Sequence, residues 1–156
     1  MEVPDMKIAA IVNRNGRQFE TVTEMTSMSE AADVMHRLSI GSVGVADGNT
    51  SAIIGLLTQH ELTAAIAQHG PHALKAPVTA FMRNPVPTCY CEDNAADVMR
   101  TMTRERCRHA VVRSMLGAVA GLVSLGDLVA ALLEEAQLEA GVLRDMARSH
   151  LLALPG

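Results

Sequence analysis

An internal repeat of about sixty residues runs through this chain and limits the folds open to it. Residues 31–35 and residues 95–99 both read Ala-Ala-Asp-Val-Met, sixty-four positions apart. A looser match follows: residues 55–62, Gly-Leu-Leu-Thr-Gln-His-Glu-Leu, correspond to residues 121–128, Gly-Leu-Val-Ser-Leu-Gly-Asp-Leu, at an offset of sixty-six. A unit of this size buries only about 60% of its unfolded surface. The two copies are therefore expected to pack on each other as one module.

Composition predicts a globular protein with a large aliphatic core. The chain has 156 residues and 49% hydrophobic content, which excludes a disordered class. Its three aromatic residues are Phe19, Phe81 and Tyr90, so the core is built from aliphatic side chains and ten Met. Single-stranded nucleic acid needs aromatic stacking platforms. With a net charge of −4 and no run of like charges, nucleic acid is not an expected partner.

The sequence shows no signal for a membrane. Residues 1–5 lack a basic start followed by an apolar stretch, and no run of eighteen apolar residues occurs. We therefore expect a cytoplasmic protein that does not contact a membrane.

The first copy predicts the order β-α-β-β-α after a helical or extended lead-in at residues 7–12. Strands are expected at residues 19–23, 40–47 and 52–57, the last two joined as a hairpin by a turn at residues 47–49. A capping box, Ser27 to Glu30, predicts the start of a helix of about ten residues. A second helix at residues 61–67 should stop at Gly70 and Pro71.

The second copy repeats this order. Residues 78–82 form a short helical lead-in, residues 85–89 an edge strand, residues 95–102 a helix capped by Asp93 or Asn94, and residues 109–112 and 119–123 a strand pair. The last helix starts near Gly126 and continues towards the C-terminus. Its apolar stripe is interrupted only by Gly141 and is too long for one module to cover; it consists of Leu128, Leu132, Ala136, Leu143, Met146 or Ala147, and Leu151.

The remaining residues with chemical potential favour structural roles. Cys89 and Cys91 would share one face of a strand, but no further ligand stands at a zinc-site spacing, so ordinary thiols are preferred over a metal pair. Asp33 and Asp97 are expected on the polar sides of their helices. Surface or capping roles are expected for His36, His60, His69, His72 and His150. No catalytic triad or phosphate-cradling glycine loop is present, so we do not expect an enzyme or a catalytic cofactor.

The duplicated β-α-β-β-α unit, with Gly-hydrophobic-hydrophobic-Ser/Thr-x-x-Asp between its third strand and last helix, resembles the CBS-domain pair, also called a Bateman module. The similarity covers about residues 7–135 and is closest to small stand-alone bacterial CBS-pair proteins. Residues 106–109, Arg-Cys-Arg-His, and the tail beyond Leu133 carry that likeness. The implied fold is α/β (α+β), with tandem repeats at residues 7–70 and 71–135 packed as a pseudo-twofold pair and a helical extension at residues 136–156.

The resemblance implies regulatory binding of an adenosine-containing ligand, such as AMP, ADP, ATP, S-adenosylmethionine or NAD(H), in clefts between the repeats. The family's hydroxyl and carboxylate fall on Ser124 and Asp127, and in the first copy on Thr58 and Glu61. A hydroxyl at a helix N-terminus suits phosphate, and a carboxylate one turn later suits ribose hydroxyls. The implied nucleotide-binding set also includes Arg106, Arg108, His109, Ala110, Thr88, Ser42, Val43 and Thr23.

One departure from the family pattern favours the second copy as the binding site: Glu61 is one methylene longer than the usual Asp. A second departure affects both copies, since the second strands read Val43-Gly44 and Ala110-Val111 where the family commonly has a proline beside the adenine ring. Arg106 and Arg108 offer planar forks for phosphate, although a solvated loop is an alternative interpretation of this run.

In a second hypothesis the chain has the same fold but binds no ligand, and it acts as a protein-interaction module. The departures from the family pattern at Glu61 and in the second strands favour this hypothesis. Both hypotheses predict a homodimer, since the stripe on the last helix needs a partner, and both leave room for an unknown effector protein. In the first hypothesis ligand binding sets the geometry of that dimer.

Overall fold

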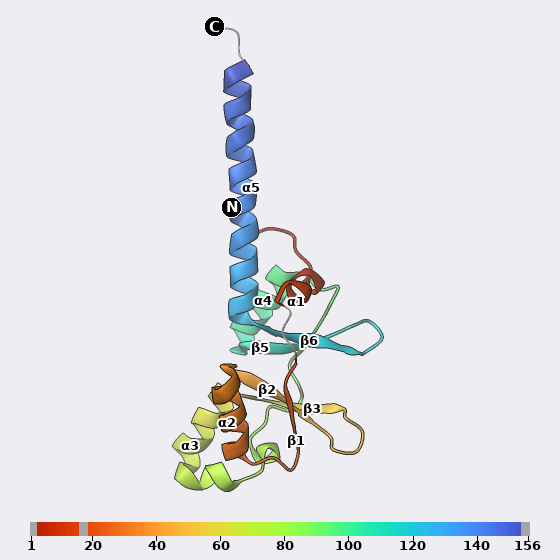
Figure 1. Cartoon of the computed structure of the whole chain (residues 1–156), viewed down its shortest axis with the longest axis vertical. Helices are drawn as coiled ribbons and strands as arrows, with labels where there is room; N and C mark the ends of the chain where they lie inside the picture. The colour runs from red at the N-terminus through yellow and green to blue at the C-terminus, as the bar shows by residue number, and fades with distance from the viewer. Residues whose placement is uncertain (1–2, 16–18, 154–156) are drawn as a thin grey trace.

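The computed structural model describes residues 3–15 and 19–153 and shows an α/β fold with two three-stranded sheets (Figure 1). The first repeat contributes β1 (Thr21–Thr23), α2 (Met28–Leu38), β2 (Ser42–Ala46), β3 (Ile53–Thr58) and α3 (Gln59–His69). The second contributes β4 (Thr88–Tyr90), α4 (Ala95–Glu105), β5 (His109–Arg113), β6 (Val119–Ser124) and α5 (Leu125–Ala153). The lead-in helix α1 spans Ile8–Asn15, and two 3₁₀ turns, η1 (Gly70–Lys75) and η2 (Val78–Ala80), connect the repeats.

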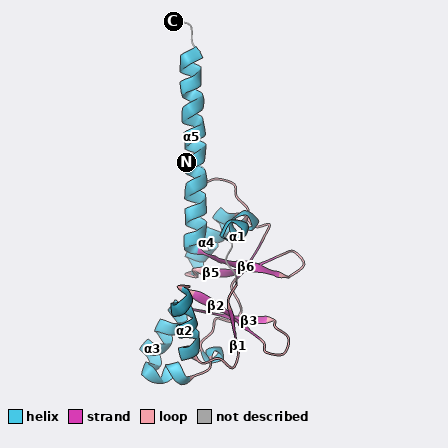
Figure 2. Ribbon diagram, in the orientation of Figure 1, coloured by secondary structure: helices cyan, strands magenta, loops and turns pink. Residues whose placement is uncertain are grey.

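Both sheets have the same topology, as the repeat predicts. In each, a short edge strand pairs in parallel with the middle strand, which pairs antiparallel with the third. Figure 2 shows the two sheets in the middle of the molecule, with α2 and α3 beside the first and α1 and α4 beside the second. The predicted order β-α-β-β-α is therefore confirmed in both copies.

Helix starts follow the local sequence signals. Ser27 Oγ accepts the Glu30 amide at 3.1 Å and the Glu30 carboxylate accepts the Ser27 amide at 3.4 Å, so the predicted capping box is confirmed. Asn94, rather than Asp93, caps α4 by accepting the Ala96 amide at 2.9 Å. The helix α3 begins at Gln59, two residues before the predicted start, and ends at His69, immediately before the predicted stop at Gly70.

The lead-in segments exchange places between the repeats. Ile8 and Ile11 of α1 are completely buried in the core of the second repeat. Backbone bonds fix this placement, from the Ile8 amide to the Asp93 carbonyl at 2.9 Å and from the Ala95 amide to the Met6 carbonyl at 2.8 Å. A segment at the start of the chain thus completes the second core.

The reciprocal exchange involves the segment before β4. Val78 is buried in the first core, and its amide donates to the Thr26 carbonyl at 2.9 Å. Arg83 and Leu56 exchange two backbone hydrogen bonds, at 2.7 and 3.1 Å. Because of both exchanges, the two packed cores do not follow the sequence order of the repeats.

The repeated glycines, Gly55 and Gly121, give room for these exchanged segments. A Cβ on Gly55 would lie 2.8 Å from Cγ of Met82, and one on Gly121 would lie 3.1 Å from Cγ1 of Val12. Each lead-in therefore crosses the third strand of the other unit where that strand has no side chain.

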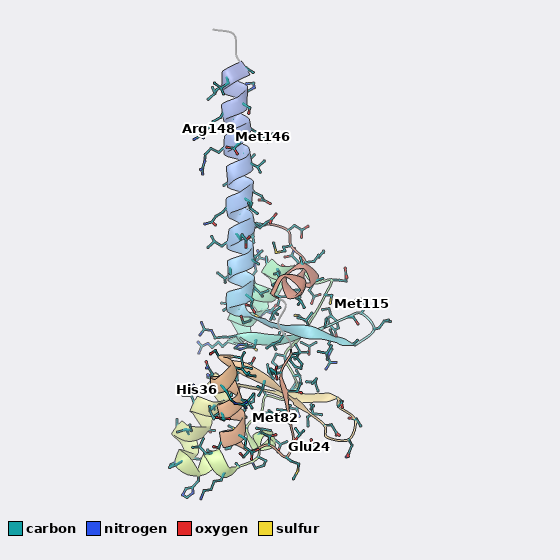
Figure 3. The ribbon with its side chains drawn as sticks, in the orientation of Figure 1. Glu24, His36, Met82, Met115, Met146 and Arg148 are labelled. Carbon is teal, nitrogen blue, oxygen red and sulfur yellow. The ribbon has the colours of Figure 1, made fainter. Side chains whose placement is uncertain are left out.

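The last helix, α5, runs for 29 residues without a break at Gly141. Leu128, Ala131 and Leu132 are buried in the second core, and beyond them the helix projects away from the body of the molecule (Figure 1). Met146 and Arg148 extend from this projecting part (Figure 3). In the described part of the chain, no helix is long and apolar enough to cross a membrane.

Candidate functional site

A cleft of about 500 Å³ lies between the two repeats. Its lining comes from the start of α3, the loop from α4 to β5, the start of α5, Gly41 before β2, and Arg83. Both repeats thus contribute a helix N-terminus to the same cleft. The amide groups of the first helical turn favour negative charge there.

The two halves of the cleft have equivalent construction. Ser42 pairs with Thr58 across the first hairpin, and His109 pairs with Ser124 across the second. The first amide of α3, from Gln59, donates to the backbone carbonyl of Gly41 at 3.0 Å. The first amide of α5, from Leu125, donates to the backbone carbonyl of Arg108 at 2.7 Å. The pseudo-twofold relation therefore extends to the cleft itself.

In the second repeat, Ser124 and Asp127 form a reciprocal cap at the start of α5. The Ser124 hydroxyl accepts the Asp127 amide at 3.0 Å, and the Asp127 carboxylate accepts the Ser124 amide at 3.0 Å. Each side chain satisfies a backbone donor that the helix leaves without a partner. This arrangement holds a hydroxyl and a carboxylate in fixed positions at the edge of the cleft.

In the first repeat, Thr58 and Glu61 form the matching cap on α3. The Glu61 carboxylate accepts the Thr58 amide at 2.9 Å and also the Thr58 hydroxyl. Its other oxygen, Oε1, lies 3.2 Å from Nε of Arg83. Both oxygens of Glu61 therefore have partners within the protein.

The cleft is predominantly basic. Arg83, Arg106 and Arg108 line it together with His60 and His109, and Glu61 is the only acidic residue among the described lining residues. Arg106 and Arg108 are exposed to solvent, whereas Arg83 is about one third exposed. Guanidinium groups bind phosphate oxygens through paired N–H donors. The cleft can therefore bind an anion that carries phosphate.

The predicted nucleotide-binding residues divide among three neighbouring cavities. The main cleft holds Thr58, Glu61, Arg106, Arg108, His109 and Ser124. Ser42 and Asp127 line a smaller cavity of about 40 Å³ that shares Gly41, His109 and Ser124 with the main cleft. Thr88 and Ala110 line a cavity of about 230 Å³ beside α4, which shares Cys107 and His109 with it.

Two of the predicted residues lie outside these cavities. Val43 is completely buried in the first core, so its side chain is a packing residue. Thr23 is exposed at the end of β1, where its amide donates to the Thr26 hydroxyl at 3.2 Å. Neither side chain is in a position to line the cleft.

Sequence reasoning missed Arg83 and His60. Arg83 lines the cleft because the segment before β4 pairs with Leu56 of the first sheet. No local sequence pattern predicts this pairing. His60 is exposed as predicted, but it also lines the cleft as the second residue of α3. Because His60 follows the cap residue Thr58 by two positions, the repeated Ser/Thr-x-x-Asp/Glu stretch could have placed His60 at the cleft. No such signal exists for Arg83.

The other polar residues have the expected surroundings. Asp33 and Asp97 are exposed and lie 3.4 Å from Arg37 and 2.9 Å from Arg100, each within its own helix. The described residues contain no group of three His, Cys, Asp or Glu side chains that could hold a metal ion. Burial, with the charges of Asp93 and Cys91 nearby, raises the pKa of the Cys89 thiol to about 12.

Comparison with known families decides what this duplicated fold is. The family model described as the CBS domain matches the chain twice, over residues 8–68 and 78–134. The chain belongs to the CBS-domain family. The two matches cover both sheets and the first turns of α5, so the protein is a CBS-domain pair with an extended last helix.

Solved structures support the same assignment. A CBS-domain containing protein from Agrobacterium tumefaciens is 33% identical, with a TM-score of 0.76 over 80% of this chain and 92% of that one. A putative signal-transduction protein with CBS domains from Burkholderia ambifaria is 26% identical, with a TM-score of 0.75 over 83% of this chain and 95% of that one. An uncharacterized 17.7 kDa protein from Acidianus ambivalens is 26% identical over 69% of this chain, and the match spans 63% of that relative's length.

Two more distant structures share the fold and contain ligands. One is a CBS-domain pair in complex with 5′-methylthioadenosine and S-adenosylmethionine, 19% identical with a TM-score of 0.71 over 85% of this chain and 99% of that one. The other is a complex with AMP, 20% identical with a TM-score of 0.62 over 76% of this chain and 90% of that one.

Proposed function

We propose that this CBS-domain pair is a regulatory module that binds an adenosine-containing ligand in the cleft between its repeats. The observation that carries the proposal is the cleft itself, where two capped helix N-termini and three arginines surround about 500 Å³. Concave sites of this volume are typical of small-ligand sites. The role is regulatory rather than catalytic.

The arginines and helix ends suit the phosphate part of such a ligand. Arg83, Arg106 and Arg108 line the cleft together with the first turns of α3 and α5. A phosphate bound there gains charge-assisted hydrogen bonds from guanidinium groups and a favourable interaction with the helix dipoles. AMP, ADP, ATP and NAD(H) all carry this group.

The ribose is assigned to the second repeat, because Asp127 has the length of the family's aspartate and Glu61 is one methylene longer. Asp127 is held by its cap beside Ser124, and a carboxylate accepts hydrogen bonds from both ribose hydroxyls. Glu61 has its oxygens engaged by Thr58 and Arg83. Adenosine-containing ligands in two structural neighbours are consistent with this choice of ligand class.

The test is substitution of Asp127 in the full-length protein. Asp127→Ala should weaken adenine-nucleotide affinity at least tenfold by isothermal titration calorimetry, which corresponds to about 1.4 kcal/mol. The cap loss should lower stability by about 0.5–2 kcal/mol without unfolding the protein. Asp33→Ala removes an exposed carboxylate from the first copy and should bind as the unchanged protein does. Equal affinity of the Asp127→Ala variant would refute the assignment.

One observation favours a second candidate, an interaction module without a ligand. The Glu61–Arg83 ion pair neutralises a basic group inside the cleft, and the exposed apolar residues of α5 need a partner in either case. In both proposals the protein forms a homodimer. In the sensor proposal, ligand at the start of α5 sets the geometry of that dimer.

A further inference from the structure

The projecting part of α5 carries an apolar seam with heptad spacing. Starting at Val129, successive steps of four and three residues reach only apolar side chains for six consecutive positions. With Leu133 as position a, these a and d residues are Val129, Leu133, Ala136, Ala140, Leu143 and Ala147. Val129, Leu133 and Leu143 are 46%, 57% and 66% exposed.

The seam lies on a different side of α5 from the one that packs on the body. Leu128, Ala131 and Leu132 are buried in the second core. Successive residues of an α-helix are about 100° apart, so Val129 and Leu133 are each turned about 100° around the helix from the buried residue before them, Leu128 and Leu132. Five of the six seam residues are exposed, and Ala136 is half-buried.

Charged residues beside the seam indicate its partner. With the same heptad numbering, Glu139 is at position g of one heptad and Arg144 is at position e of the next. In a parallel pair of helices, a g residue faces the e residue five positions later on the other helix, and opposite charges there stabilise the pair. A second copy of α5 in parallel would therefore form the pair Glu139–Arg144 twice, once on each side.

The same alignment also matches the apolar flanks. Met146 is the next g residue and Leu151 the next e residue, and they are 63% and 67% exposed. In a parallel pair they meet and widen the apolar contact towards the C-terminal end. In an antiparallel pair that uses the same six seam positions, g faces g, so Glu139 would face Glu139 of the second copy.

We propose that α5 pairs in parallel with α5 of a second copy through the seam Val129–Ala147, with Glu139 and Arg144 fixing the orientation. The inference rests on the homodimer of the proposed function and specifies its interface. A twofold axis along the paired helices makes the contact self-complementary. It places the two modules side by side at one end, with the start of each α5 beside its own nucleotide cleft.

Disulfide trapping in the nucleotide-free, full-length protein tests the orientation. Position 147 is an a position and faces itself in a parallel pair, so Ala147→Cys should form a 147–147 disulfide within one dimer, detected by peptide mass spectrometry. Ser149→Cys, at position c outside the seam, is the matched control and should stay reduced. A disulfide between 129 and 147 in the variant Val129→Cys/Ala147→Cys, or a monomer by light scattering at micromolar concentration, would overturn the proposal.

Charge reversal gives an independent result. Glu139→Arg and Arg144→Glu should each weaken dimerisation about tenfold, since each replaces two attractive pairs by two repulsive ones. The double variant restores opposite charges and should dimerise within about twofold of the unchanged protein. Failure of the double variant to recover would contradict the parallel register.

Separate measurements of nucleotide binding distinguish the two proposals. A protein that forms the 147–147 disulfide but binds no nucleotide supports the seam and refutes the sensor function. One that binds nucleotide but is monomeric, or links 129 to 147, supports the sensor function and refutes the seam.

Discussion

At the scale of single residues, the Cys89 thiol makes the stability of the protein depend on pH. Its pKa is raised from 9.0 to about 12 in the folded state, first by burial and then by Asp93 and Cys91. Below pH 9 the thiol is protonated in both the folded and unfolded chain, so its contribution to stability is complete. Between pH 9 and about 12 the unfolded chain loses the proton first, and the contribution is lost.

We therefore expect the free energy of unfolding, measured in urea, to fall as pH rises above 9. The Cys89→Ala variant should show a smaller fall over the same interval, although its stability at pH 7 will be lower. The Cys91→Ala variant keeps the Cys89 thiol and removes only the last of the three causes of its raised pKa, so its decline should stay close to that of the unchanged protein. Identical slopes for Cys89→Ala and the unchanged protein would contradict this account.

Gly55 is a second residue whose role can be tested alone. A methyl group there would lie 2.8 Å from Cγ of the half-buried Met82, which is closer than such carbon atoms approach each other in proteins. Gly55→Ala should therefore destabilise the protein by about 1–3 kcal/mol in urea unfolding. Adding Met82→Ala should recover part of that loss, because it removes the atoms that clash.

Gly141→Ala is the matched control for this substitution. Nothing lies within 4 Å of a Cβ at Gly141, which is in the middle of α5. This variant should be more stable by about 0.5–1 kcal/mol, the usual difference between Gly and Ala inside a helix. A neutral Gly55→Ala would mean that the exchanged segment does not cross β3 at this point.

At the scale of elements, the exchange of lead-ins predicts that α1 stabilises the second repeat. Ile11 is completely buried among residues of that repeat. Ile11→Ala should cost about 2–5 kcal/mol, and hydrogen exchange should accelerate in β5 as well as in α1. Ala10→Gln, at an exposed position one residue earlier, should change stability by less than about 0.5 kcal/mol. Protection of β5 that is unchanged in the Ile11→Ala variant would contradict the exchange.

Elements with local signals were predictable from the sequence. The capping box at Ser27, the cap before α4 and the stop at Gly70 depend on neighbouring residues, so the sequence alone locates them. The exchange of α1 and the segment at Val78 was not predicted, because it depends on which core buries a short apolar stretch. The 3₁₀ turn η1 after α3 was also not predicted, because Pro71 was interpreted as a helix breaker and not as the start of a further helical turn.

The candidate site shows the same division. Ser124 with Asp127, and Thr58 with Glu61, were recognised as repeated pairs, and the structure shows that each pair caps a helix at the cleft. The rule that found the cap at Ser27 applies to them too. Arg83 could not be placed, because its position beside Glu61 arises from tertiary packing of the segment that crosses the first sheet.

At the scale of the whole molecule, α5 connects the cleft with the proposed dimer seam. Its cap, Ser124 with Asp127, borders the cleft, and its far end carries the exposed apolar residues. A ligand that holds the cap in one position therefore acts on the same helix that joins the two copies in the proposed dimer. A ligand present at one hundred times its dissociation constant would add about 2.7 kcal/mol to stability.

The most direct test of the central claim is a thermal-shift screen of protein shown to be free of co-purified nucleotide. The ligands are AMP, ADP, ATP, NAD, NADH and S-adenosylmethionine, with an extrinsic dye because the chain has no Trp. The account predicts a concentration-dependent rise in Tm of roughly 5–10 °C at one hundred times the dissociation constant of one of them. In the Asp127→Ala variant the rise should be about half as large or less at the same ligand concentrations, because tenfold weaker binding leaves about 1.4 kcal/mol of stabilisation. No shift with any ligand would contradict the sensor function and leave the interaction module.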